Sequence, residues 1–127
     1  MKIKITERGW AGHFCGSGSC QFRRNTLIEY GNKRVVVSTV GNYQPQDTPN
    51  NKDKREHEIG INRFYETMAF KAKKEGVYWE ADVSQVVRFR SNWALSELEQ
   101  ETDLKADKMH DKVVSEIYKK LKKSNLP

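Results

Sequence analysis

This sequence is poor in the features that mark several common protein classes. It has 127 residues, of which 36% are hydrophobic. No apolar run approaches the roughly 20 residues that a membrane-crossing helix needs. Residues 1–6 alternate polar and apolar side chains, whereas a signal peptide needs a continuous apolar core. The chain has only two cysteines, Cys15 and Cys20, which a cytosolic setting would keep reduced. We therefore expect one soluble cytosolic domain over residues 1–127 with no membrane segment.

The sequence also lacks the spacing patterns of common catalytic and metal sites. His13, Cys15 and Cys20 could supply zinc ligands, with His57 or His110 as a fourth, but they include no Cys-x-x-Cys pair, and structural zinc sites usually present paired ligands. His13 lies near both cysteines without a group that would orient it as a base. Glu80 and Asp82 do not have the spacing of a metal-dependent nuclease, and no Walker or Rossmann glycine loop occurs. We therefore expect no enzyme, no catalytic residue, no metal and no cofactor.

The net charge of +6 favours an anionic partner. The alternative is a generally solvated lysine surface, because many of the lysines fall on the expected C-terminal helix. Both interpretations stay open at this point.

Alternating apolar residues and turn residues predict an antiparallel sheet built from hairpins. The expected strands are residues 2–7, 21–30, 33–40, 59–72 and 77–89. Gly31-Asn32 gives the clearest hairpin turn in the chain. Residues 73–76 predict a second turn, and residues 42–58 predict an exposed loop without apolar periodicity.

The apolar period then changes from that of strands to that of helices. Ser91 or Asn92 could cap a short helix, and Thr102 or Asp103 could cap a longer one. The apolar stripe of the longer helix is predicted to comprise Leu104, Met109, Val113, Ile117 and Leu121. The fold class is therefore α+β, with an N-terminal antiparallel β-sheet over about residues 1–90 and two C-terminal α-helices over about residues 92–123.

Two groups of residues predict an anion-binding site. Arg23 and Arg24 lie next to each other on a strand and must point to opposite faces of the sheet. A second group lies where the last strand meets the first helix, with arginine, aromatic and amide side chains beside a helix start. The predicted ligand-binding residues are Arg23, Arg24, Phe89, Arg90, Asn92 and Trp93. Either arginine could face the ligand, and the two aromatic residues could instead be core.

The chain resembles the phage-encoded Thoeris anti-defence family of signal-sequestering proteins. The similarity rests on residues 8–14 (RGWAGHF), 22–27 (FRRNTL), 34–41 (RVVVSTVG), 63–70 (RFYETMAF) and 78–83 (YWEADV). It covers most of the chain apart from residues 42–57, where the loop looks longer than in the family.

This resemblance implies a non-enzymatic sponge in the cytoplasm of the infected host. Such a protein binds a cyclic ADP-ribose isomer made by the TIR protein of Thoeris and holds it intact, and some members also bind CBASS cyclic oligonucleotides. It further implies a homo-oligomer, a dimer or a hexamer, with ligand at subunit contacts and part of the helix stripe and Trp93 between subunits. The rival hypothesis is a small basic nucleic-acid-binding regulator of a phage or prophage, which would lose binding steeply as salt rises.

Overall fold

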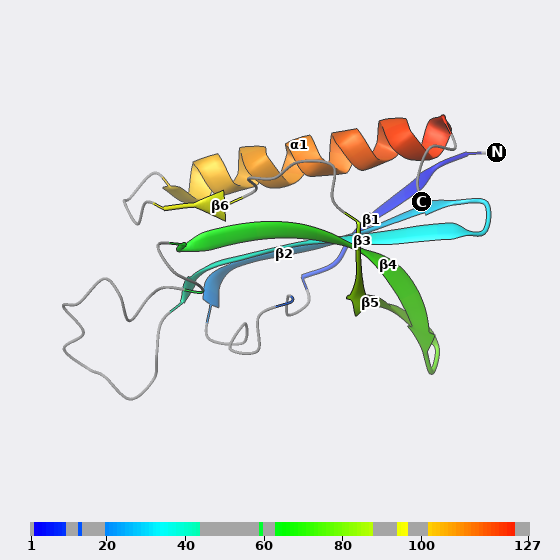
Figure 1. Cartoon of the computed structure of the whole chain (residues 1–127), viewed down its shortest axis with the longest axis horizontal. Helices are drawn as coiled ribbons and strands as arrows, with labels where there is room; N and C mark the ends of the chain where they lie inside the picture. The colour runs from blue at the N-terminus through cyan, green and yellow to red at the C-terminus, as the bar shows by residue number, and fades with distance from the viewer. Residues whose placement is uncertain are drawn as a thin grey trace.

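The chain folds as an antiparallel β-sheet followed by one C-terminal helix. The structure, a computed structural model, describes residues 2–9, 13, 20–43, 59, 63–87, 94–96 and 102–123. The elements in these ranges are β1 (Lys4–Glu7), β2 (Cys20–Tyr30), β3 (Lys33–Tyr43), β4 (Tyr65–Glu75), β5 (Tyr78–Val87), β6 (Ala94–Leu95) and α1 (Thr102–Lys122). The sheet order is β1-β2-β3-β4-β5, with β6 paired to β4. α1 lies along one face of the sheet, and the β4–β5 hairpin bends away from the helix (Figure 1). Within the described residues, no helix is long and apolar enough to cross a membrane.

The β2–β3 hairpin confirms the predicted turn, and the strand ends lie further out than predicted. Gly31 has a φ of 60°, which this tight turn requires. β3 continues to Tyr43, two residues into the predicted loop, because Tyr43 still pairs with Cys20. β4 likewise runs through the predicted turn at 73–76 as far as Glu75. Residues 44–58 of the predicted loop lie outside the described residues.

The prediction of two helices is wrong, because α1 is the one helix in the described part of the chain. Where the shorter helix was expected, Ala94 and Leu95 form β6 and pair with Glu66 and Tyr65 of β4. Leu95 also packs against a buried apolar cluster. Pairing with a strand that is already ordered outweighs the weak helical preference of this short segment.

Two apolar clusters lie between α1 and the sheet and pack the helix against it. The larger consists of Ile28, Val35, Val37, Ala69, Val87, Val113, Ile117 and Leu121, and the smaller of Phe22, Phe64, Tyr65 and Ala106. The C-terminal half of the predicted helix stripe is therefore buried within the chain itself. Leu104, predicted to belong to the stripe, is 63% exposed.

β5 folds back over the sheet face opposite the helix. The register of β4 with β5 shifts between Phe70 and Ala72, and such a bulge bends and twists a strand. As a result Trp79 of β5 reaches residues of other strands. Arg8 Nη1 donates to its carbonyl oxygen at 2.6 Å, and the guanidinium carbon of Arg34 lies 4.2 Å from the centre of its ring. Arg8 therefore connects the two outer strands of the sheet.

Replacing Gly41 by alanine should lower the free energy of unfolding by about 2–3 kcal/mol, because the added methyl group would overpack the site. A β-carbon on Gly41 would overlap the buried ring of Tyr65. Urea denaturation should show a lower midpoint with an unchanged slope. Gly9→Ala is the matched control, since a β-carbon there meets no atom within 4 Å. Equal midpoints for the two variants would contradict the close packing at Gly41.

Candidate functional site

Arg23 and Arg24 point to opposite faces of the sheet, as predicted from strand alternation. Arg24 reaches Asp107 and Asp111 on α1. Arg23 pairs in the ladder with Val40 and is exposed to solvent on the other face. The two arginines therefore meet different chemical surroundings.

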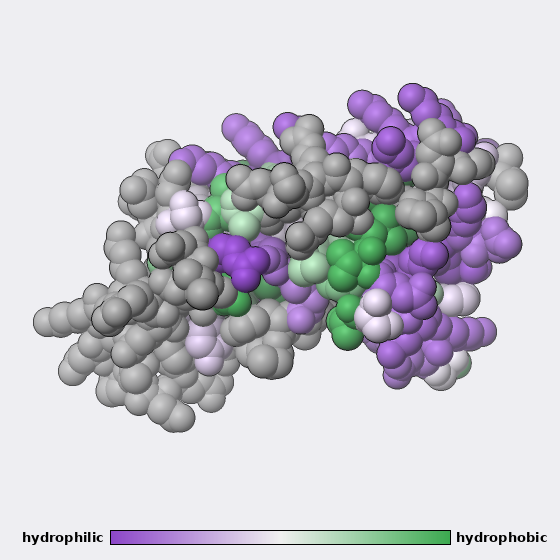
Figure 2. Space-filling model, viewed as in Figure 1, coloured by the Kyte–Doolittle hydropathy of each residue, from purple (hydrophilic) through white to green (hydrophobic). Residues whose placement is uncertain are grey.

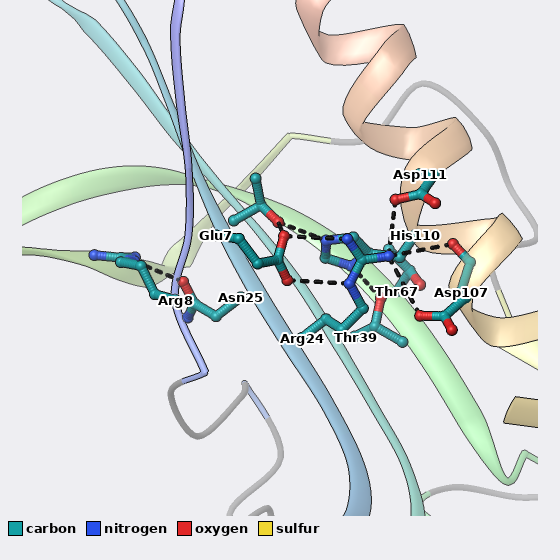
Figure 3. A network of polar contacts seen from close by, with 10 residues as sticks. Glu7, Arg8, Arg24, Asn25, Thr39, Thr67, Asp107, His110 and Asp111 are labelled. Carbon is teal, nitrogen blue, oxygen red and sulfur yellow. Dashed lines mark hydrogen bonds and ion pairs between the residues drawn. The ribbon is translucent and has the colours of Figure 1, made fainter.

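Arg24 is held by three carboxylates between the sheet and α1. Its Nε and Nη2 donate to the two oxygens of Glu7 at 3.0 and 3.1 Å, and its Nη1 donates to Asp111 Oδ1 at 2.8 Å (Figure 3). Asp107 Oδ1 lies 3.4 Å from the same Nη1. Burial alone would lower the pKa of Arg24, but Glu7 and Asp111 outweigh it and raise the pKa above its ordinary value. The guanidinium therefore connects β1 and β2 with α1, and carboxylates of this chain occupy its donors.

A chain of hydrogen bonds runs from Glu7 into the space under α1. Thr26 Oγ1 lies 2.6 Å from Glu7 Oε2 and 2.7 Å from His110 Nε2. Thr39 Oγ1 lies 2.7 Å from His110 Nδ1 and 2.6 Å from Thr67 Oγ1. An ionised carboxylate only accepts, so the Thr26 hydroxyl donates to Glu7 and accepts from His110. His110 then carries its proton on Nε2 and accepts from Thr39 at Nδ1. We call Thr26, Thr39, Thr67 and His110 the polar seam.

The charged state of the polar seam follows from burial and from the neighbouring ions. Burial would raise the pKa of Glu7, but the hydrogen bonds from Arg24 and Thr26 and the charge of Arg24 outweigh it, so this pKa lies below its ordinary value. Burial and the charge of Arg24 lower the pKa of His110 to about 4, against the opposing charges of Glu7 and Asp111. At pH 7 the structure therefore holds an ionised Glu7 beside a neutral His110.

A second set of polar contacts lies on the face opposite the helix. The backbone N–H of His13 donates to Ser38 Oγ at 3.2 Å, and His13 Nδ1 lies 2.9 Å from the same oxygen. His13 Nε2 lies 3.2 Å from Glu66 Oε1, and Arg63 Nη1 donates to Glu66 Oε2 at 2.6 Å. Both ring nitrogens of His13 are therefore engaged, which argues against its predicted alternative as a zinc ligand.

The Ser38–His13–Glu66 contacts have the composition of a hydrolase triad but not its accessibility. Ser38 is 1% exposed in the middle of β3, and its oxygen already accepts the backbone N–H of His13. A nucleophile must reach its substrate, so this serine acts as an anchor for His13. Cys20 is also buried, and burial raises the pKa of its thiol, which keeps it protonated. Within the described residues, no group of His, Cys, Asp and Glu could hold a metal ion.

Two cationic side chains of the face opposite the helix are open to solvent. Arg23 is exposed, and among the described residues it makes no hydrogen bond or ion pair. In the ladder, Arg23 lies opposite Val40, which in turn lies opposite Glu66, so these side chains share one face. Arg63, whose side chain is 47% exposed, shares Glu66 with His13. Sequence reasoning missed Arg63, although it begins a motif that carries the family resemblance.

Four of the predicted ligand-binding residues lie outside the described residues. These are Phe89, Arg90, Asn92 and Trp93. Of the predicted set, the structure therefore places only Arg23 and Arg24, and it places them on opposite faces. Sequence reasoning considered His110 only as a possible fourth zinc ligand and left it out of the buried stripe of α1. Its signal was its spacing of four residues from Ala106 and three from Val113 on the buried side of the helix.

The fold and these contacts define a small α+β protein in which a polar seam and two apolar clusters join one helix to an antiparallel sheet. No protein-family model, curated protein or solved structure matches the chain. A function for this chain is therefore inferred from the chemistry of these residues and from the family resemblance of the sequence.

Proposed function

We propose that this protein is a phage anti-defence sponge that sequesters a cyclic ADP-ribose isomer made by the Thoeris TIR protein. In this proposal the ligand is bound in the host cytoplasm and is not degraded. CBASS cyclic oligonucleotides are proposed as further ligands. The proposal follows from the family resemblance, and the exposed guanidinium of Arg23 is the single observation of the structure that carries it.

Arg23 has the chemistry that the proposed ligand needs. A cyclic ADP-ribose carries two phosphates, and a guanidinium binds phosphate through charge-assisted, two-pronged hydrogen bonds. Arg23 is solvent-accessible, whereas the donors of Arg24 are taken by carboxylates. Arg63 on the same side of the sheet is half exposed and is paired with Glu66 through Nη1, so its other N–H groups offer a second set of donors. We therefore assign phosphate binding to Arg23 and a structural role to Arg24.

The contacts around His13 support binding without turnover. A sponge gains nothing from a reactive nucleophile beside its ligand. The hydroxyl of Ser38 is buried, and both ring nitrogens of His13 are engaged. These side chains hold the surface beside Arg23 in place and leave the ligand unchanged.

Exposed apolar side chains on both outer strands of the sheet support the proposed homo-oligomer. Ile5 on β1 is 49% exposed, and Val83 and Val86 on β5 are 62% and 43% exposed. Each of these strands has a sheet neighbour on one side in the order given above, so its other edge can pair or pack with another subunit. A dimer or a hexamer would cover such edges.

Arg23→Ala should weaken binding of the cyclic ADP-ribose isomer by about 2 kcal/mol, or roughly thirtyfold, because a charge-assisted hydrogen bond to phosphate is lost. Isothermal titration calorimetry of the purified variant with the TIR-generated isomer measures this directly. The Arg23 side chain is exposed and makes no hydrogen bond or ion pair with the described residues, so the variant should keep the thermal stability and sedimentation coefficient of the wild type.

Lys108→Ala is the matched control for lost surface charge, because this residue lies on α1, on the other side of the sheet. We expect its affinity to stay within about threefold of the wild type. If both variants bind the isomer as tightly as the wild type, the assignment of Arg23 is wrong. If the wild type itself does not bind, the proposed function is wrong.

A further inference from the structure

Three segments that are far apart in the sequence meet at one end of the molecule. Leu121 belongs to the larger apolar cluster, and Ile3 and Tyr30 pack against it. The start of β1, the β2–β3 turn and the C-terminal turns of α1 therefore lie together, as Figure 1 also shows. We call this region, formed by residues 2–4, 29–34 and 116–123, the basic end.

The basic end carries a strong excess of positive charge. Its cationic residues are Lys2, Lys4, Lys33, Arg34, Lys119, Lys120, Lys122 and Lys123. Among the described residues of these segments, the acidic ones are Glu29 and Glu116. Glu29 is already ion-paired with Arg34 at 3.0 Å. Hydrophilic side chains gather at this end in the view of Figure 2. Within the described residues of these three segments, cations therefore outnumber carboxylates by eight to two.

The N-terminal half of the same helix provides a contrast. There Lys105, Lys108 and Lys112 alternate with Asp103, Asp107 and Asp111. These carboxylates bind the protein's own groups, since Tyr65 donates to Asp103 and Arg24 to the other two. Cations and anions are thus balanced in this half, whereas the excess charge collects at the other. A uniformly solvated lysine face would not show this division.

The apolar residues of the basic end are turned inward. Ile117 and Leu121 are fully buried against the sheet, and the exposed positions of the last turns are lysines. Such a surface has no apolar side chain to insert into a lipid bilayer, and it lacks the apolar centre typical of a protein–protein interface. Lysine ammonium groups act as point charges that contact phosphates without reading bases.

We propose that the basic end binds the phosphate backbone of nucleic acid, independently of sequence. This binding surface is separate from the face that carries Arg23. It would hold the protein near DNA or RNA while the other face stays open to a small ligand. The expected binding is weak and salt-dependent, because it depends on counterion release.

The test compares two triple variants of the full chain with the same net charge. K119Q/K122Q/K123Q removes lysines of the basic end, and K105Q/K108Q/K112Q removes lysines of the balanced half of α1. Binding to a fluorescent DNA duplex of about 20 base pairs is followed by anisotropy between about 50 and 200 mM salt. Matching single-stranded DNA and RNA serve as further probes.

The basic-end variant should bind the duplex at least about tenfold more weakly. Its plot of log affinity against log salt should also be shallower, with a slope smaller in magnitude by about 2–3. The control variant should stay within about threefold of the wild type. Circular dichroism and retained binding of the cyclic ADP-ribose isomer would show that both variants are folded. Equal losses in the two variants, or no binding by the wild type at the lowest salt, would overturn the proposal. Binding to anionic vesicles without binding to any nucleic acid would also overturn it.

Discussion

Arg24→Ala should lower the free energy of unfolding by about 2 kcal/mol at pH 7, less than the loss for breaking a fully buried ion pair, because its carboxylate partners are about half exposed or more. The substitution leaves Glu7 facing Asp107 and Asp111 without the cation between them. Part of the loss is screened, because these carboxylates are themselves half exposed. Arg24→Lys keeps the charge but cannot reproduce the paired hydrogen bonds to Glu7, and it should lose about 1 kcal/mol. Urea denaturation monitored by circular dichroism measures both effects.

Arg23→Ala is the matched control on the neighbouring position of the same strand. Its side chain is exposed and makes no hydrogen bond or ion pair with the described residues, so its stability should stay within about 0.5 kcal/mol of the wild type. The pair thus separates structure from ligand binding: one arginine supports the fold, and the other is proposed to bind phosphate. A similar loss of stability in both variants would contradict the division of roles.

The stability of the protein should fall by roughly 3 kcal/mol between about pH 6.5 and pH 4 because of His110. The pKa of His110 is about 4 in the folded protein, against the ordinary histidine value of 6.5 that applies to the unfolded chain. Between pH 6.5 and pH 4, His110 is mostly protonated in the unfolded chain and mostly neutral in the folded protein. Lowering the pH through this range therefore favours unfolding. The groups that face the ring are Thr26 and Thr39 from the sheet, with the charges of Glu7, Arg24 and Asp111 nearby. Chemical denaturation at a series of pH values measures the slope.

His110→Gln tests this pH dependence without relying on absolute stability. The amide can still donate and accept hydrogen bonds in the polar seam, but it does not titrate. The variant should therefore lose most of the slope between about pH 6.5 and 4.5, even if its stability at pH 7 is lower by about 1–2 kcal/mol. Below about pH 4.5 both proteins should still lose stability, because the pKa of Glu7 is lowered in the folded state. An unchanged slope in His110→Gln would contradict the buried neutral state of this histidine.

The polar seam also fixes how α1 sits on the sheet. It lies beside two apolar clusters, whose contacts are non-directional and so fix the position of the helix less strictly than hydrogen bonds do. His110 must meet Thr26 and Thr39 together, and Tyr65 must donate to Asp103 at 2.6 Å. A shifted helix would leave these buried polar groups without partners, at a cost of about 1–3 kcal/mol for each. The seam therefore selects one arrangement of helix and sheet.

Local patterns predicted the parts of the fold that depend on nearby residues. The turn at Gly31-Asn32, the start of the long helix at Thr102 and the opposed directions of Arg23 and Arg24 all follow from backbone geometry. The burial of Val113 on the helix stripe likewise follows from helical spacing.

The remaining features depend on contacts between distant segments. The stripe could not show that His110 is core and Leu104 exposed, because the threonines that satisfy the histidine come from β2 and β3. The expected short helix gave way to β6 because an edge of β4 was available for pairing. Similarly, the carboxylates around Arg24 come from β1 and α1, so the sequence alone left open which arginine could bind a ligand.

The most direct measurement of the central claim is a capture-and-release experiment with the TIR-generated cyclic ADP-ribose isomer. The protein is incubated with the isomer, freed of unbound ligand by gel filtration and heated until it denatures. The released compound is then identified by mass spectrometry and tested on the Thoeris effector. A sponge should release the intact, active isomer in a fixed ratio to protein. Release of a degraded product would indicate an enzyme, and release of no ligand would contradict sequestration.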